Sequence, residues 1–238
     1  MANSARAVVF DLDGTLVDTA ADIQAILGEV FAQDGLVAPS VPAVRDMLGD
    51  GARVLIERAV ATSPRPADVD GLLRRFVARY AQVPCRHSVP YPGAVDLLAT
   101  LRRDGWRVGL CTNKPQAPTR GLLAALDLGG LFDSVIGGDA LPGIRKPDPR
   151  HLAAVLAELA VPPRQAVMVG DGPNDLLTAR ALGVPCVLVS FGYTAVPARE
   201  LGADVLVDRL ADVAGPCARL VEQASAATQG PPPATHAG

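Results

Sequence analysis

The sequence predicts an α/β fold, with a Rossmann-like parallel sheet as the core and an all-helical domain inserted into it. A short apolar run at residues 7–10 has the length and composition of a buried strand. The stretch from about residue 18 to residue 87 shows helical periodicity throughout and contains no strand candidate. From Pro92 onward, strand and helix patterns alternate, which is typical of a parallel sheet with helices on both faces.

The helical stretch begins near Thr19, a residue type that caps helices, with Asp22 three positions later as in a capping box. Apolar side chains then recur at helical spacing until Gly35 ends the first helix. Three further helices are expected at residues 41–48, 52–61 and 67–81. The Gly49-Asp50-Gly51 segment breaks the helical pattern between the first two of these.

The alternating part of the chain predicts further strands with helices between them. The strands are expected at residues 107–111, 134–136, 166–169, 186–189 and 204–207. The helices are expected at residues 93–103, 118–126, 149–159 and 175–182, with a last helix after the final strand. We expect the first strand to join the same sheet, so that the helical stretch is an insertion after it.

These patterns divide the chain into a discontinuous core and an inserted cap. The α/β core is predicted at residues 1–17 and 88–224, and the helical cap at residues 18–87. Residues 225–238 contain no acid, lysine or arginine and are rich in proline, glycine and alanine, so a disordered tail is predicted there.

The composition is that of a globular chain, because 49% of its 238 residues are apolar and 20% are charged. Aromatic residues make up only 4% and the net charge is -3, which argues against a nucleic-acid-binding protein. The four cysteines include no C-x-x-C pair, as expected of a reduced, cytoplasmic protein. No apolar run reaches the ~20 residues of a membrane span, and the first run is too short for a signal peptide. We therefore expect a cytoplasmic protein.

Polar side chains follow directly after three of the predicted strands, and a loop after a fourth strand carries another. In chain order they are Asp11 and Asp13, Thr112 and Asn113, Lys146 in a proline-rich loop, and Asp171 with Asp175. Because open parallel sheets bind ligands beyond the carboxyl ends of their strands, we expect these side chains to line one crevice. Taken singly, each is more often a loop, turn or capping residue, or a solvated lysine. The ordered combination is what predicts a site.

The charges in that crevice require compensation. Two carboxylates about 4 Å apart repel each other by ~4 kcal/mol at an effective dielectric of about 20. Such a cluster persists if some members are protonated or if a cation lies among them. Lys146 alone does not balance four acids, whereas a divalent cation can, and a few oxygen ligands suit Mg²⁺ better than Ca²⁺ or zinc. The cation would attract a phosphate, to which Thr112 and Asn113 offer uncharged donors and Lys146 a point charge.

Four segments carry these residues, namely 11–19 (DLDGTLVDT), 111–114 (CTNK), 145–149 (RKPDP) and 169–175 (VGDGPND). Together they resemble the motifs of the haloacid dehalogenase superfamily of phosphotransferases, and within it the phosphoglycolate phosphatases. The resemblance extends to about residue 222, and the helical stretch falls where that family carries its cap. Gly172-Pro173 departs from the many relatives that have Ser or Thr after the aspartate, which should alter the stiffness of the loop more than metal binding.

The resemblance implies the chemistry of the first motif. Asp11 would attack phosphorus and form an aspartyl phosphate. Asp13 would protonate the leaving alkoxide and then deprotonate the water that hydrolyses the intermediate. A leaving halide needs no proton, so an acid at Asp13 favours a phosphate ester over a haloacid as the substrate.

The resemblance also implies how metal and phosphate are held. The carboxylates of Asp11 and Asp171 and the backbone carbonyl of Asp13 would bind Mg²⁺. The phosphoryl oxygens would be bound by Thr112, Asn113 and Lys146. Asp175 would support the metal site or orient Lys146.

The expected activity is hydrolysis of a small phosphorylated metabolite, with 2-phosphoglycolate as the expected substrate, under a closing cap. A phosphomutase of the β-phosphoglucomutase kind, or a phosphatase for another small sugar phosphate, remains an alternative. A non-catalytic sensor of sugar phosphates is disfavoured because all the motif residues are present. No nucleic-acid or membrane partner is expected, and the chain would be a monomer or homodimer. Asp50 and Arg45 of the cap receive no role.

Overall fold

Six parallel strands form the central sheet, in the order β5-β4-β1-β6-β7-β8. The computed structural model describes residues 5–63 and 65–227. Strand β1 (Ala7–Phe10) lies between β4 (Arg107–Cys111) and β6 (Ala166–Gly170). The outer strands are β5 (Ser134–Ile136), β7 (Cys186–Val189) and β8 (Val205–Val207). The predicted parallel α/β sheet is confirmed, and the chain turns to opposite sides of β1, which is where such sheets bind ligands.

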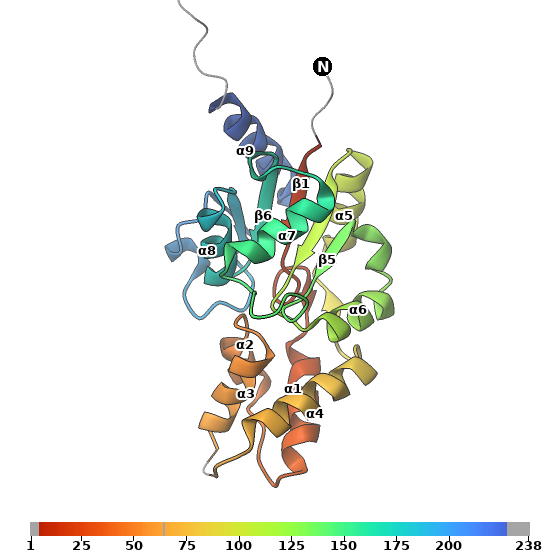
Figure 1. Cartoon of the computed structure of the whole chain (residues 1–238), viewed down its shortest axis with the longest axis vertical. Coiled ribbons are helices and arrows are strands. Elements are labelled where there is room, and N and C mark those ends of the chain that lie inside the picture. Colours follow the sequence, from red (N-terminus) through yellow and green to blue (C-terminus); the bar gives the residue numbers. More distant parts are fainter. Residues whose placement is uncertain (1–4, 64, 228–238) are drawn as a thin grey trace, which may run out of the picture.

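Helices cover both faces of this sheet (Figure 1). Along β1, Val8 and Phe10 pack into the apolar cluster that includes α5, α6 and α9, whereas Ala7 and Val9 pack into the one that includes α7 and α8. Both faces of β1 are therefore buried, which explains why its sequence is a continuous apolar run. These helices are α5 (Ala94–Arg103), α6 (Gln116–Ala125), α7 (Pro149–Leu159), α8 (Pro173–Ala181) and α9 (Ala214–Ala227). Short 3₁₀ turns lie at Gly129–Leu131, Pro163–Gln165, Ala198–Glu200 and Leu210–Asp212.

Four helices between Asp18 and Val89 form a separate unit below the sheet, which we call the cap (Figure 1). They are α1 (Ala20–Ala32), α2 (Val41–Met47), α3 (Ala52–Ala61) and α4 (Val69–Gln82). Their apolar faces share a cluster of their own, in which Ile26, Leu55 and Phe76 are almost fully buried. Helix α4 begins two residues later than predicted because the Asp68 carboxylate accepts the N–H of Gly71 and caps the helix.

A two-stranded antiparallel ribbon connects the cap to the sheet. Strand β2 (Val17–Asp18) pairs with β3 (Val89–Pro90), so the chain enters and leaves the cap along neighbouring paths. The expectation that the stretch from residue 18 to residue 87 is wholly helical is therefore wrong at Asp18. A strand of two residues is too short to leave a periodic pattern in the sequence.

The start of α1 also differs from the predicted capping box. Thr19 occupies the N-cap position, but its side chain makes no capping hydrogen bond, and its hydroxyl donates to Asp13 Oδ1 at 2.7 Å. The Asp22 carboxylate accepts from the backbone N–H groups of residues 86–88 and from the Ser88 hydroxyl. Local spacing could not indicate these partners because they come from the far end of the cap. Asp22 thus connects the first helix of the cap to residues 86–88, where the chain leaves the cap.

The chain remains helical beyond the predicted start of the tail. Residues 225–227 belong to α9, so the predicted boundary at 225 is wrong by three residues. Alanine favours helix, and Ser225 Oγ accepts a hydrogen bond from Gln165 Nε2 at 2.8 Å. The remainder of the predicted tail, residues 228–238, lies outside the described residues. Over the part of the chain that the structure describes, no helix has both the length and the apolarity needed to cross a membrane.

Candidate active site

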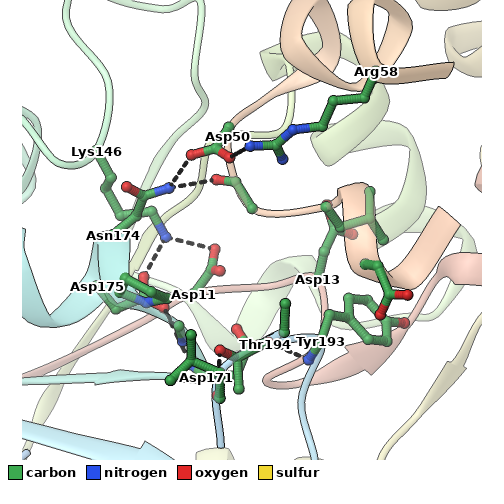
Figure 2. Close-up of a pocket in the computed structure, with 17 residues that line it drawn as sticks. Asp11, Asp13, Asp50, Arg58, Lys146, Asp171, Asn174, Asp175, Tyr193 and Thr194 are labelled. Atoms are coloured by element: carbon green, nitrogen blue, oxygen red, sulfur yellow. Dashed lines mark hydrogen bonds and ion pairs between the residues drawn. The ribbon is translucent and has the colours of Figure 1, made fainter. Parts of the chain in front are cut away.

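Four strand ends contribute the predicted site residues, and Figure 2 shows Asp11, Asp13, Lys146, Asp171 and Asp175 around one crevice. Asp11 follows β1, Thr112 follows β4, the loop carrying Lys146 follows β5, and Asp171 follows β6. Polar side chains are rarely so buried unless they are paired. The buried ones are Asp11, Thr112, Asn113, Lys146, Asp171 and Asp175, and Asp13 is half-buried.

Lys146 supplies the positive charge at the centre of the crevice. Its Nζ lies 2.8 Å from Asp11 Oδ1 and 2.6 Å from Asp175 Oδ1, and its side chain is only 1% exposed. Burial alone would lower the pKa of this amine, but the two carboxylates raise it well above its ordinary value. Lys146 is therefore a charged group held against Asp11, not the solvated lysine that a loop position alone would favour.

The carboxylates of Asp11, Asp171 and Asp175 form a compact cluster. One oxygen of each lies within 4.8 Å of those of the other two. Burial raises the pKa of Asp11 to about 6 although Lys146 lowers it, and burial with the neighbouring negative charges raises that of Asp171 to about 8. One lysine does not balance three acids, and oxygen ligands suit a hard divalent cation. The residues present therefore fit the predicted metal site.

Asp171 is held by groups that the sequence did not predict. The Thr15 hydroxyl donates to its Oδ1 at 3.1 Å, and the backbone N–H of Tyr193 donates to its Oδ2 at 2.6 Å. Gly14 has a φ of 84°, and a Cβ there would overlap Asp171 Oδ2 and lie 2.9 Å from the Tyr193 ring. The D-x-D-G-T motif thus needs its glycine so that the loop can approach this carboxylate. Tyr193 follows the end of β7 by four residues, but it contacts Asp171 through its backbone N–H, which the residue type does not predict.

Asp175 closes the loop between β6 and α8. Its Oδ2 accepts the N–H groups of Asp171 and Gly172, both at 3.1 Å, while its Oδ1 faces Lys146. Pro173 stands in the first turn of α8, where a missing N–H removes no helical hydrogen bond. The Gly172-Pro173 pair is therefore compatible with the carboxylate arrangement.

The Asp13 carboxylate lies outside this three-acid cluster and faces the cap. Its Oδ1 accepts from the Thr19 hydroxyl and lies 3.1 Å from Lys114 Nζ. Lys114 is itself buried and donates to the Tyr80 hydroxyl at 2.6 Å. Burial lowers the pKa of the Lys114 amine and the charge of Asp13 opposes this change. Lys114 follows the same strand end as the predicted phosphate-binding pair, but the sequence pattern did not predict a role for it.

Thr112 and Asn113 lie beside the crevice, as the end of β4 predicts. Thr112 Oγ1 accepts the N–H of Lys114 at 3.2 Å, which leaves the hydroxyl hydrogen for another acceptor. The Asn113 side-chain amide donates to the carbonyls of Gly49 at 2.8 Å and Lys146 at 2.9 Å. Asn113 thus joins the crevice to a cap loop, and its side chain would have to release one of these carbonyls to donate to a phosphate. Its role in phosphate binding stays a prediction.

The cap loop at residues 49–51 reaches over the crevice (Figure 2). Asn174 Nδ2 donates to Asp50 Oδ1 at 2.7 Å, and Asp50 forms an ion pair with Arg58 at 2.5 Å. Asp50, which received no role from the sequence, therefore links the cap to the core. A contact of this kind can close when a ligand is bound and break when it leaves.

Two cavities open from the crevice. The larger, of about 190 Å³, is lined by the three-acid cluster, Lys146 and Arg58, among others. The smaller, of about 40 Å³, lies between core and cap and is lined by Lys114, Tyr80 and apolar cap side chains, among others. Asp11 and Asp13 line both cavities, so a ligand that spans them would meet both acids.

Comparisons with known proteins point to one family. A family model described as haloacid dehalogenase-like hydrolase matches residues 5–183. A phosphoglycolate phosphatase of Caulobacter vibrioides is 42% identical over 226 residues, which cover 94% of this chain and 95% of the relative. A phosphoglycolate phosphatase of Rhodospirillum rubrum is 44% identical over 215 residues, which cover 87% of this chain and 89% of the relative.

Solved structures share the fold. A predicted phosphoglycolate phosphatase from Haemophilus somnus superimposes with a TM-score of 0.81 at 29% identity, covering 90% of this chain and 98% of that one. CbbY from Rhodobacter sphaeroides, in complex with phosphate, gives a TM-score of 0.73 at 28% identity, covering 88% and 96%. The resemblance inferred from the four motifs is confirmed, and the chain belongs to the haloacid dehalogenase-like hydrolase family.

Proposed function

We propose that this protein is a Mg²⁺-dependent phosphatase that hydrolyses 2-phosphoglycolate through a phosphoryl group carried on Asp11. The observation that carries this proposal is the position of Asp11, at the end of β1, 2.8 Å from Lys146 and within the three-acid cluster. The relatives named phosphoglycolate phosphatase support the choice of substrate.

Asp11 acts first, as the nucleophile. Its carboxylate attacks phosphorus in line with the ester oxygen, and the bond from phosphorus to that oxygen breaks. Lys146 Nζ, already beside Asp11, would offset charge on the phosphoryl oxygens, and the free hydroxyl hydrogen of Thr112 would donate to one of them. The product of this step is an aspartyl phosphate and a leaving alkoxide.

Asp13 acts on the leaving group. It would give a proton to the alkoxide and later take one from the water that attacks phosphorus and restores Asp11. Thr19 and Lys114 hold its carboxylate at the wall of the smaller cavity, where the leaving group would lie. Asp13 is also half-buried, so it is shielded from bulk water yet remains open to the substrate.

The metal ion would be held by the carboxylates of Asp11 and Asp171 and the backbone carbonyl of Asp13, with Asp175 in support. When bound, Mg²⁺ supplies positive charge that offsets the repulsion between Asp11 and the phosphoryl group. Thr15 and the N–H of Tyr193 keep Asp171 in place for that task.

A sugar phosphate is the second candidate substrate. CbbY from Rhodobacter sphaeroides has been solved with xylulose-(1,5)bisphosphate, and that structure gives a TM-score of 0.74 at 26% identity. A phosphomutase of the β-phosphoglucomutase kind would use the same motifs but return the phosphoryl group to a sugar. The protein would act in the cytoplasm on a small metabolite, as a monomer or homodimer.

Release of inorganic phosphate from a set of monoesters tests this proposal. The set is 2-phosphoglycolate, xylulose 1,5-bisphosphate and glucose 1-phosphate, each with Mg²⁺, and the measured quantity is kcat/KM. We expect 2-phosphoglycolate to be the best substrate. Faster hydrolysis of either sugar phosphate, or interconversion of glucose phosphates without release of phosphate, would contradict the assignment.

A further inference from the structure

The smaller cavity has charged and polar side chains, Lys114 among them, on its core side and mostly apolar walls on its cap side. Lys114 is buried at its core side, and the cap contributes Ile23, Leu55 and Phe76. Tyr80 is the polar side chain that the described part of the cap brings to this cavity. A volume of about 40 Å³ holds a group of only a few heavy atoms, comparable to two or three waters. The space therefore suits a small leaving group that carries a negative charge.

Lys114 differs from most cations of the chain because its side chain is buried. It and Lys146 are the only lysines in the sequence, and both are buried in the crevice, with Lys114 having a side chain 2% exposed. Its Nζ lies 3.1 and 3.3 Å from the two oxygens of Asp13 and 2.6 Å from the Tyr80 hydroxyl. Burying a lysine is costly unless it is paired, and Asp13 and Tyr80 provide this pairing at the wall of the smaller cavity.

Arg45 and Arg58 of the cap are each paired with another acid. Arg45 pairs with Asp18 at 2.7 Å, Arg58 pairs with Asp50, and both arginines are more than 40% exposed. Lys146 faces Asp11 and the larger cavity. Among the described residues that line the smaller cavity, Lys114 is the one positively charged side chain.

We propose that Lys114, together with the Tyr80 hydroxyl, binds the carboxylate of the leaving group and so selects phosphate esters of small α-hydroxy acids. The inference rests on the proposed phosphatase function and adds to it the residue that recognises the acid.

The distances agree with this assignment. An ester oxygen in hydrogen-bond contact with Asp13, at about 2.7 Å, would lie within roughly 6 Å of Lys114 Nζ, because Asp13 Oδ1 and Nζ are 3.1 Å apart. In a leaving group with one carbon between its ester oxygen and its carboxylate, the carboxylate would reach to within hydrogen-bond distance of Lys114 Nζ. On the cap side, Tyr80 is the polar side chain available to the hydroxyl groups of a sugar, so most hydroxyl groups that face the cap would stay unpaired.

A comparison of two substrates distinguishes carboxylate binding by Lys114 from an effect of Lys114 on Asp13 alone. The pair is 2-phosphoglycolate and 2-hydroxyethyl phosphate, which has a similar length but no carboxylate. For Lys114→Met, we expect kcat/KM to fall about 10²- to 10³-fold with the first and less than about 10-fold with the second. Glycolate should also inhibit the wild-type protein and lose its effect on the variant.

Equal losses with both substrates would overturn the inference, because Lys114 would then act only by orienting Asp13. If the wild-type protein itself does not prefer 2-phosphoglycolate to 2-hydroxyethyl phosphate, both the inference and the proposed substrate fail. If the wild-type preference exists and survives in the variant, the inference alone fails.

Tyr80→Phe provides a second variant should Lys114→Met not fold, because it removes one hydroxyl and keeps the ring in the cap cluster. We expect it to lower kcat/KM for 2-phosphoglycolate by about 10-fold relative to 2-hydroxyethyl phosphate. An unchanged ratio of the two substrates in a folded Tyr80→Phe protein would likewise overturn the inference.

Discussion

Lys146 Nζ lies 2.8 Å from Asp11 Oδ1, in a crevice where the lysine side chain is only 1% exposed. The same amine pairs with Asp175 at 2.6 Å, so one cation serves the nucleophile and a supporting acid. This shared ion pair determines what happens when the lysine is removed.

Lys146→Met should damage both activity and stability. Two buried carboxylates would lose their cation, which costs about 3–5 kcal/mol in the free energy of unfolding. Loss of the charge beside the phosphoryl group should lower kcat/KM by about 10²-fold or more. Urea unfolding and phosphate release measure the two effects. Arg150→Met is the control, since Arg150 is 69% exposed and pairs only at the surface with Asp148, and a similar loss there would contradict the account.

Gly170→Ala should disturb the site without changing any catalytic group. A Cβ at Gly170 would overlap the Asp175 carboxyl, whereas a Cβ at Gly172 would meet no atom within 4 Å. We expect Gly170→Ala to displace Asp175 from Lys146, with about 1–3 kcal/mol lost in stability and a large fall in kcat. Gly172→Ala should change both far less. Equal effects of the two substitutions would show that the position of Asp175 does not depend on this close packing.

Asp22→Asn should weaken the connection between cap and sheet in a pH-dependent way. Burial alone would raise the pKa of Asp22, but hydrogen bonds from residues 86–88 lower it below its ordinary value. A depressed folded-state pKa means that the stabilisation is fully present above the unfolded pKa of about 3.9 and is lost as pH falls through the folded pKa. At neutral pH we expect the variant to be about 2–4 kcal/mol less stable. The asparagine side chain has only one acceptor oxygen, whereas the carboxylate accepts hydrogen bonds through both of its oxygens.

Unfolding of the two proteins at several pH values tests this expectation. The difference between wild type and Asp22→Asn should shrink as the pH falls below about 4. Asp70→Asn, which alters a carboxylate 63% exposed, should leave the unfolding midpoint nearly unchanged at every pH. A difference for Asp22→Asn that is constant down to acidic pH would contradict the hydrogen-bonded carboxylate as its source.

Removal of divalent metal should abolish phosphate release, and Mg²⁺ should restore it. Binding can be followed independently of activity, because a ligand that binds only the folded state raises the thermal midpoint. We expect Mg²⁺ to raise the midpoint of the wild-type protein and to have much less effect on Asp171→Asn. Full activity in the presence of a strong chelator, or an equal shift in both proteins, would contradict a metal site at the three-acid cluster.

The order of strands and helices followed from the sequence because each element carries its own pattern. The strands at 107–111, 134–136 and 186–189 agree with the structure residue for residue. Features that are very short, or that depend on residues far apart in the chain, could not be predicted from the sequence. The β2–β3 ribbon has no periodicity, and Asp22 finds its partners more than 60 residues away.

The same limit applies to the site. Groups that stand directly after a strand were predictable, since strand ends meet at one edge of the sheet. Lys114 was overlooked because its use depends on Tyr80, which a separate helix of the cap brings to it. Tyr193 was overlooked because its backbone N–H, rather than its side chain, contacts Asp171.

The most direct test of the central claim is a search for the phosphoryl group on Asp11. Enzyme quenched with acid during turnover of 2-phosphoglycolate and digested should yield a peptide containing Asp11 that is heavier by one phosphoryl group. Asp11→Asn should lack this adduct and lose ~10⁴-fold or more in kcat, because an amide is a poor nucleophile. A phosphoryl group found on another residue, or substantial turnover by Asp11→Asn, would contradict the account.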